Sequence, residues 1–352
     1  GDAPPAQPWS EQVIPTTQPG YRGWGDPTIV FNSVGQALYT HMVRPSGSSI
    51  QHLESAILFT GTTQLAAEQP EIAEFVADCR RLGTCEEVIE KAEKYIIRHG
   101  GKPAFPTTIA VDNVAAHFTT DHKSTPLEGW EDKMIFEKGQ LVKLDVGVQI
   151  HGRIGDNALT IEVGNGSNHT EQIRASRESR DSAIEQMHPG TPWHKVGAAA
   201  EQPVIDAGFT SIRNLCGHQL KVGELHAGIS VPSYRCGADN IGFQGTVELN
   251  SFYAVEPFNT TGKSGLIENV QPSNSSNIYR VTGNIDIRKA LAKKKLKPLG
   301  AQLARNLESR YSNLPFAERW AFPILEKPFP EADEASRQSK WNALVKKFCL
   351  KK

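Results

Sequence analysis

The stretch KLDVGVQIHGRIGDNALT, residues 143–160, decides the fold of this chain. Its apolar residues occupy every second position up to Ile150, which is the pattern of a strand with one face in a core. His151 and Gly152 then interrupt the alternation and predict a two-residue turn between antiparallel strands. Apolar alternation resumes at Leu159, so the sequence predicts a β-hairpin as the central element.

Two aspartates lie on the other face of this hairpin. A two-residue turn pairs Ile150 with Arg153. That register places Gly147 opposite Asp156 and makes Asp145 a diagonal neighbour of Asp156. Two carboxylates this close repel each other unless a positive charge lies between them. The hairpin alone leaves two alternatives open, a bound metal ion or two solvated aspartates on an exposed sheet face.

Three motifs further along the chain supply side chains of the types that bind metals. His218 lies in NLCGHQL, His226 in ELHAGISVP and Glu256 in YAVEPFNT. Taken singly, each is more often structural, as a loop or core histidine, a strand-capping histidine or an edge-strand carboxylate. Together with the two aspartates they provide carboxylates and an imidazole in one order, which favours a site for a hard divalent ion in a hydrolase.

The chemistry of these side chains also suggests which of them would hold metal ions and which would act on the substrate. Asp156 is the best candidate for a carboxylate that bridges two ions, and the other aspartate, His218 and Glu256 fit as terminal ligands. An imidazole can donate a hydrogen bond to the oxyanion of a tetrahedral intermediate. His226 fits this second role, as does His117 in NVAAHFT. The pattern therefore predicts a metal-dependent hydrolase before any fold is assumed.

The composition of the 352 residues argues against other classes of protein. Lys and Arg total 38 and Asp and Glu total 39, so the net charge of −1 gives no electrostatic case for nucleic-acid binding. The run KKKLK at 293–297 favours a solvated helix face over a nucleic-acid or ribosome contact. No apolar run has the length of a membrane span, and the 5 irregularly spaced cysteines predict reduced thiols in a cytoplasmic protein.

The spacing of apolar residues predicts the helices and strands in the rest of the chain. The stretch EEVIEKAEKYIIRHGG predicts a helix that stops at Gly100 and Gly101. Two more helices are expected within 171–208, the second disturbed by Pro203, and a basic helix over 287–311 broken at Pro298. Short strands are expected around 212–216, 228–231 and 251–257.

The motifs resemble the successive signatures of methionine aminopeptidases, in particular the type 2 branch of archaea and eukaryotes. The segments that carry the resemblance are PAFPTTIAVDNVAAHFT, KLDVGVQIHGRIGDNA, NLCGHQL, LHAGISVP and YAVEPF. The later segment SRYSNLPFAERW resembles the end of the helical subdomain that is typical of that branch. The similarity covers about residues 80–320, roughly two-thirds of the chain.

The resemblance implies an α+β pita-bread (creatinase/aminopeptidase) fold, a curved antiparallel sheet flanked by helices with a helical subdomain insert. The expected domains are an irregular N-terminal arm (1–50), the pita-bread catalytic domain (51–265), the helical insert (266–322) and a divergent or truncated C-terminal segment (323–352). The implied activity is removal of N-terminal methionine from nascent proteins, through attack of a metal-bound hydroxide on the methionine carbonyl. The implied partners are nascent polypeptides and the ribosome, without a membrane.

The resemblance also assigns roles to residues. It implies two divalent ions (Co, Mn, Fe or Zn), or one tightly held ion, and a methionine pocket lined by a phenylalanine. Glu256 would shuttle a proton, and two histidines would contact the substrate and stabilise the intermediate. The implied ligands are Asp145, Asp156, His218 and Glu256, the implied substrate contacts are His117 and His226, and the implied pocket residue is Phe105.

One ligand of the family's pattern has no evident counterpart in this sequence. It is a glutamate in a C-terminal QFEHT-like strand, which bridges both metals. If ALVKKF is a remnant of that strand, Cys349 occupies the position of the glutamate, and Glu326, Glu331 and Glu334 are alternatives. Loss of a bridging carboxylate would weaken the second metal most, and loss of the last strands of the family's fold would open a sheet edge beside the site.

Two alternative functions remain, and the missing glutamate favours the first of them. One is a catalytically weakened or inactive relative that acts as a ribosome- or RNA-binding module through the same fold. Another is a different pita-bread hydrolase, such as a proline-directed aminopeptidase or creatinase. The motif around His117 and the helical insert match the methionine branch better.

Overall fold

The computed structural model describes residues 9–10, 28–32, 37–40, 84–98, 100–121, 135–164, 167–267, 277–281, 298–325 and 331–351. The helices are α3 (Cys85–Arg98), α4 (Thr170–Gln186), α5 (Trp193–Asp206), η2 (Ile241–Phe243), α7 (Pro298–Tyr311), α8 (Glu318–Ala321), η3 (Phe322–Leu325) and α9 (Glu334–Phe348). The strands are β1 (Trp9–Ser10), β2 (Thr28–Asn32), β3 (Ala37–Thr40), β4 (Lys102–Val111), β5 (Leu141–Ile150), β6 (Arg153–Glu162), β7 (Thr210–Ser211), β8 (Gly217–Leu220), β9 (Ser230–Val231), β10 (Phe252–Ala254), β11 (Asn259–Thr260), β12 (Ile278–Val281), β13 (Phe316–Ala317) and β14 (Cys349–Lys351).

The predicted hairpin is formed by β5 and β6, and its predicted register is confirmed. Ile150 pairs with Arg153 across a two-residue turn. His151 and Gly152 have φ angles of 51° and 82°, the left-handed backbone that such hairpin turns require. β4 pairs antiparallel with the other side of β5, which gives a sheet of order β4-β5-β6.

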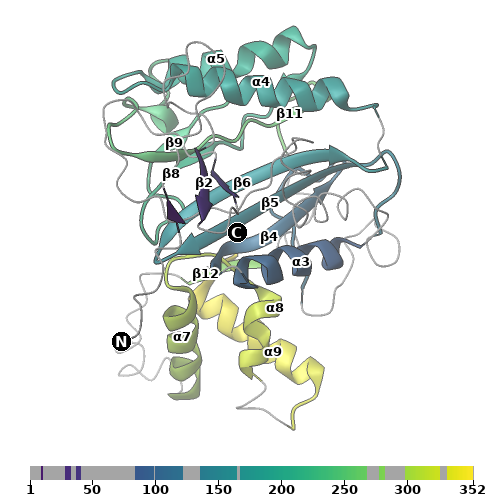
Figure 1. Cartoon of the computed structure of the whole chain (residues 1–352). Coiled ribbons are helices and arrows are strands. Elements are labelled where there is room, and N and C mark those ends of the chain that lie inside the picture. Colours follow the sequence, from purple (N-terminus) through teal and green to yellow (C-terminus); the bar gives the residue numbers. More distant parts are fainter. Residues whose placement is uncertain are drawn as a thin grey trace.

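Helix α3 covers one face of this sheet, as expected from its apolar periodicity (Figure 1). Thr84 and Glu87 form a reciprocal capping box at its start, each side chain accepting a hydrogen bond from the other's backbone N–H. Gly100, at a φ of 84°, ends the helix as predicted. The helix packs on the apolar face of β5, which leaves the aspartate face of the hairpin for the rest of the fold.

The second half of the predicted catalytic domain places short strands against two long helices, α4 and α5. β8 lies between β10 and β9 in one sheet, and β11 pairs with β7 in another. Helix α5 runs through Pro203 and ends three residues later, at Asp206, so the predicted disturbance falls close to the C-terminal end of the helix. The strand expected at 212–216 begins at Gly217 instead, and this shift places His218 within β8.

The helical insert and the C-terminal segment share one core. β12 is flanked by β13 and β14, and α7 and α9 pack nearby (Figure 1). Trp341 of α9 is 0% exposed, and its ring centroid lies 5.7 Å from that of Tyr279 and 6.3 Å from that of Phe322. The predicted boundary at residue 322 therefore falls inside a hydrophobic cluster. Pro298 begins α7, and the first part of the predicted basic helix, residues 287–297, lies outside the described residues.

Replacing Trp341 by alanine is expected to destabilise this subdomain by about 3–5 kcal/mol, because it leaves a large cavity in the cluster. Thermal melting and hydrogen exchange of α7 and α9 would measure the effect. Ser339→Ala, on an exposed position of the same helix, is the matched control. Equal stability of the two variants would show that the C-terminal segment does not support the insert.

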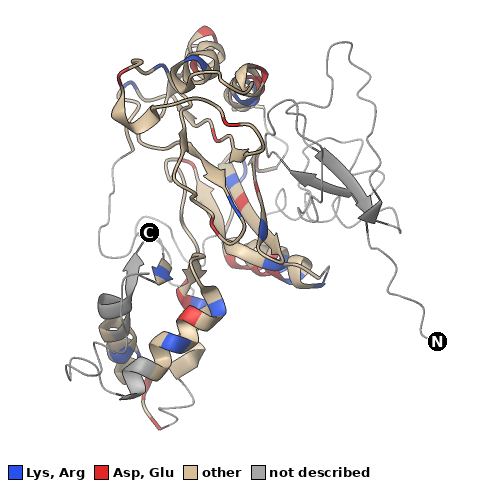
Figure 2. Cartoon of the chain, turned by 90° about the vertical axis from the view of Figure 1, so that its left-hand side faces the viewer, with Lys and Arg blue, Asp and Glu red and all other residues tan. Residues whose placement is uncertain are grey.

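Parts of the predicted N-terminal arm form strands. β1, β2 and β3 make a three-stranded antiparallel sheet, which the prediction of an irregular arm did not include. The other residues of that arm, residues 51–83 and the KKKLK run lie outside the described residues. Acidic and basic residues are interspersed over the described helices and strands (Figure 2). None of the helices in the described ranges is long and apolar enough to span a bilayer.

Candidate metal centre and active site

A cavity of about 370 Å³ brings together every site residue that the sequence singled out. Its walls come from β4, β5, β6 and β8, from the loops around them, and from the insert. The roles of these residues remain predictions, but their convergence is a property of the fold. The singled-out residues that line the cavity are Phe105, His117, Asp145, Asp156, His218, His226 and Glu256.

Three of the four predicted metal ligands form a compact group. The Nε2 atom of His218 lies 3.3 Å from Oδ2 of Asp156 and 3.0 Å from Oε1 of Glu256. One ligand atom from each residue lies within 4.8 Å of the others. The pairing of His218 with Ala254 aligns β8 with β10, and the chain then reaches Glu256 two residues later. Three short segments, far apart in sequence, thus meet at one point.

Asp145 faces the same cavity from β5 but lies outside this compact group. Gly147 pairs with Asp156, and Asp145 pairs with Ala158 two positions further along β6. The predicted diagonal relation of the two aspartates is therefore confirmed by the register. Asp145 is placed to serve an ion beside the compact group, since both aspartates line one cavity.

The electrostatics of the group favour a cation at its centre. Burial alone would lower the pKa of the His218 imidazole. Hydrogen bonds to Asp156 and Glu256 and their negative charges outweigh burial and raise the pKa to about 10. The two carboxylates are thus satisfied by positive charge between them, which a proton on the imidazole or a divalent ion can supply. The donor set and its burial fit a divalent metal.

The metal-free protein is expected to lose stability as the pH rises from about 6.5 to about 10. The pKa of His218 is higher in the folded chain than in the unfolded chain, so the bound proton stabilises the fold. This contribution is complete below the unfolded pKa and is lost as the pH passes the folded pKa. Urea denaturation at a series of pH values, with a chelator present, would measure it.

The control for this pH dependence is another histidine. His218→Gln should flatten the dependence of the unfolding free energy on pH. His188→Gln, at an exposed position after α4, should leave it unchanged. If the unfolding free energy depends on pH equally steeply in the two variants, the assignment of the proton to His218 is contradicted.

The two histidines that were predicted to contact the substrate, His117 and His226, both line the cavity. The ring centroid of His226 lies 4.3 Å from that of His218, with an angle of 71° between the rings. His226 is exposed, so its imidazole is accessible from the open side of the cavity. His117 follows β4 and has a φ of 63°, which is unusual for a residue with a side chain. Both imidazoles therefore border the space next to the metal ligands.

Phe105 is held at the cavity wall by its strand partner. It is 6% exposed and pairs with Gly147 in the ladder between β4 and β5. A Cβ atom at position 147 would lie 2.2 Å from Cε1 of the Phe105 ring. Glycine is therefore the residue that leaves room for the ring at this place in the cavity wall.

Gly147→Ala is expected to displace the Phe105 ring, with a loss of about 1–3 kcal/mol in stability and a higher KM for substrate. Denaturation and steady-state kinetics would measure both effects. The double variant Gly147→Ala/Phe105→Ala tests the cause, because without the ring the new methyl group has space. If Gly147→Ala lowers the stability of the Phe105→Ala variant as much as it lowers that of the wild type, the clash with Phe105 is not the cause.

Within the described residues, none of the positions suggested for the fifth carboxylate joins the compact group. The segment ALVKKF lies within α9, so it is helical and not the remnant of a strand. Cys349 lies in β14, where its backbone pairs with Val281 of β12. Glu331 and Glu334 are exposed and do not line the cavity, and Glu326 lies outside the described residues. Within the described ranges, no further carboxylate joins the three-residue group.

A second cavity, of about 300 Å³, borders the same carboxylates from the other side. It lies along β6, which is an edge strand of the sheet β4-β5-β6. Asn157 of β6 lines it and is 5% exposed, yet neither polar atom of its side chain has a hydrogen-bond partner. The structure therefore places unpaired polar atoms in the wall of this second cavity.

The sequence interpretation missed the contribution of the insert. Ile278 of β12 and Pro315, just before β13, line the large cavity opposite the hairpin. Both are apolar, and with Leu225 they extend the wall formed by Phe105. Pro315 lies within the NLPFAERW stretch, so the family-like motif was the one available signal for its role.

Comparison with known proteins identifies the family. Residues 69–288 match the metallopeptidase family M24. A methionine aminopeptidase from Pyrococcus horikoshii is 36% identical over 234 residues, which is 66% of this chain and 70% of the relative. One from Saccharolobus solfataricus is 31% identical over 299 residues, 84% of this chain and 86% of the relative.

Among solved structures, a thermophilic Arx1 has a similar fold. It superimposes with a TM-score of 0.58 at 18% sequence identity, covering 79% of this chain and 78% of that chain. At this identity the likeness concerns the fold alone. Together with the family match, it confirms the predicted α+β pita-bread fold.

Proposed function

The chain belongs to metallopeptidase family M24, and we propose that it is a methionine aminopeptidase of the type 2 branch. Its substrates would be nascent proteins, from which it removes the N-terminal methionine in the cytoplasm. The observation that carries the proposal is the convergence of Asp156, His218 and Glu256 in one cavity. The relatives named methionine aminopeptidase support the choice of substrate.

The metal would be divalent, as the family's description as metallopeptidases implies. Asp156, His218 and Glu256 would hold one ion, and Asp145 is placed to help hold a second. Carboxylates with one imidazole suit Co, Mn, Fe or Zn. When bound, such ions lower the pKa of a bound water and polarise the substrate carbonyl.

The side chains around the ligands would perform the remaining steps. Glu256 borders the cavity with a side chain that is 29% exposed, so it can accept the proton of the attacking water. The same carboxyl group would then deliver that proton to the leaving amine nitrogen. His226 and His117 would donate hydrogen bonds to the oxygen on which negative charge develops.

The apolar wall would receive the methionine side chain. Phe105, Leu225, Ile278 and Pro315 line the cavity next to the ligands. An apolar, close-fitting wall favours an unbranched thioether side chain over charged ones. Phe105 lies in β4, which pairs with the hairpin, and Ile278 lies in β12 of the insert. Both parts of the fold would therefore contribute to the choice of substrate.

The direct test is hydrolysis of Met-Ala-Ser by the purified chain, with added Co or Mn and with a chelator. Metal-dependent release of methionine is expected, and N-acetylated Met-Ala-Ser is the matched control because it has no free amino group. No release from folded protein at any metal concentration would contradict the proposal. That result would favour the binding module, for which the absence of a fifth carboxylate near the described group is the supporting observation.

A further inference from the structure

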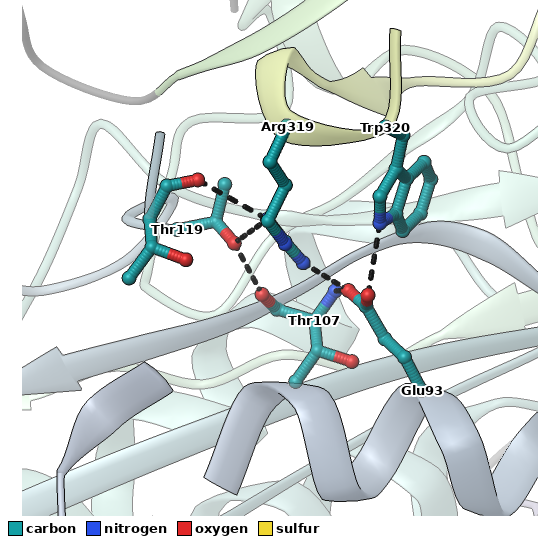
Figure 3. A network of polar contacts seen from close by, with 6 residues as sticks. Glu93, Thr107, Thr119, Arg319 and Trp320 are labelled. Carbon is teal, nitrogen blue, oxygen red and sulfur yellow. Dashed lines mark hydrogen bonds and ion pairs between the residues drawn. The ribbon is translucent and has the colours of Figure 1, made fainter. Parts of the chain in front are cut away.

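A buried polar network connects the insert to the loop that carries His117 (Figure 3). Arg319 of α8 forms an ion pair with Glu93 of α3, and their side chains are 14% and 11% exposed. The indole Nε1 of Trp320 donates a hydrogen bond of 2.8 Å to the same carboxylate. The network therefore joins elements that are more than 200 residues apart in sequence.

Arg319 also holds the backbone that follows His117. Its guanidinium donates to Oγ1 of Thr119 at 2.7 Å and to the carbonyl oxygen of Thr120 at 3.2 Å. The Thr119 hydroxyl in turn donates to the carbonyl of Thr107 at 2.8 Å. The side-chain amide of Asn277, from the insert, donates to the carbonyl of Thr119 at 3.0 Å.

The loop needs such support because His117 adopts an unfavourable backbone conformation. Its φ of 63° persists only where the surrounding structure holds it. The next three residues provide the anchor, since Phe118, Thr119 and Thr120 are 1%, 0% and 0% exposed. The described hydrogen bonds fix these residues on β4 on one side and on Arg319 on the other.

The chemistry of the network requires arginine at position 319. One planar guanidinium bonds to the Glu93 carboxylate, a hydroxyl and a carbonyl at once, whereas a lysine ammonium on a flexible stem cannot reproduce that fork. Burial raises the pKa of Glu93, an effect that the positive charge of Arg319 opposes. Each member of the pair thus depends on the other for compensation of its buried charge.

We propose that Arg319 is a positioning residue, which fixes the His117 imidazole in the active-site cavity through Thr119 and Thr120. The insert would then take part in catalysis by setting the position of a hydrogen-bond donor to the substrate. This inference rests on the proposed function, in which His117 contacts the substrate. It assigns a role to the insert beyond the lining of the pocket.

The test is a double-mutant cycle between Arg319→Lys and His117→Ala in the metal-loaded full chain. Arg319→Lys is expected to lower kcat/KM for Met-Ala-Ser by ~10- to 100-fold, because a small displacement of a catalytic group has an effect of this size. In the His117→Ala background, the same substitution should have almost no further effect. Arg305→Lys, on an exposed position of α7, is the matched control and should be neutral.

The outcomes separate positioning from general stability. Equal losses from Arg319→Lys in both backgrounds, or no loss at all in folded protein, would overturn the proposal. If Arg319→Lys does not fold, Thr119→Val replaces it, because valine keeps the shape and removes the hydroxyl that Arg319 binds.

A second readout does not depend on activity. Arg319→Lys should shift the NMR signals of the His117 imidazole and speed hydrogen exchange of residues 115–120, and Arg305→Lys should do neither. If the wild type releases no methionine, the proposed function fails, but these measurements still test the positioning. Unchanged His117 signals in folded Arg319→Lys protein would contradict it.

Discussion

Asp156→Asn is expected to abolish metal-dependent release of methionine, by at least ~10³-fold in kcat/KM. Asparagine keeps the shape of the side chain but removes the negative charge that faces His218 at 3.3 Å. A cation at the centre of the group would then be held by one carboxylate and one imidazole. Metal content after dialysis and the rate of Met-Ala-Ser hydrolysis would measure the two losses together.

The fold should survive this substitution. Asp156 lies on an edge strand, and its backbone pairing with Gly147 does not involve the carboxylate. Circular dichroism should therefore match the wild type, whereas the metal-free melting temperature should fall, because the protonated His218 loses one of its two carboxylate partners. Asp239→Asn, at an exposed position, is the matched control and should keep both metal and activity. Wild-type activity in Asp156→Asn would remove Asp156 from the site.

His226→Ala is expected to lower kcat by about 10²–10³-fold, the usual effect of removing one hydrogen-bond donor to an oxyanion. Its ring lies beside His218 but is not part of the compact ligand group, so metal content should be unchanged. The substrate should still bind, because the apolar wall is intact. Steady-state kinetics and metal analysis on the same preparation would separate these effects.

His188→Ala is the control for this substitution, since His188 is exposed and does not line the cavity. Loss of metal in His226→Ala would show that this histidine is a ligand instead of a donor. Unchanged kcat would remove it from the mechanism. The variants of Asp156 and His226 thus differ in metal content although both lose activity, and this difference separates holding the ion from acting on the substrate.

Local features of the hairpin were predictable because they depend on neighbouring residues. Alternation of apolar residues sets the face of a strand, and a turn with left-handed residues sets its register. The register predicted from His151 and Gly152 is the one observed. Helix α3 was predictable for the same reason, since its apolar period and its stop at Gly100 are local signals.

Other elements were not fully predicted from the sequence. Pro203 lies within α5, which continues to Asp206, and the local pattern did not show where this helix ends. ALVKKF, which the family pattern suggested as the remnant of a strand, is helical, as its Ala, Leu and Lys residues favour. The helix to which it belongs is anchored upstream by Trp341, whose indole is buried against the insert.

The sequence by itself determined the residue types of the site, the face of the hairpin that carries the aspartates, and the resemblance to a family. Only the tertiary structure decided that Asp156, His218 and Glu256 meet within 4.8 Å and that Asp145 lies beside them. It also decided that Arg319 reaches Thr119 across 200 residues of sequence. The reason is physical: turns and periodicity depend on adjacent residues, whereas ligand geometry and buried ion pairs depend on how separate elements pack.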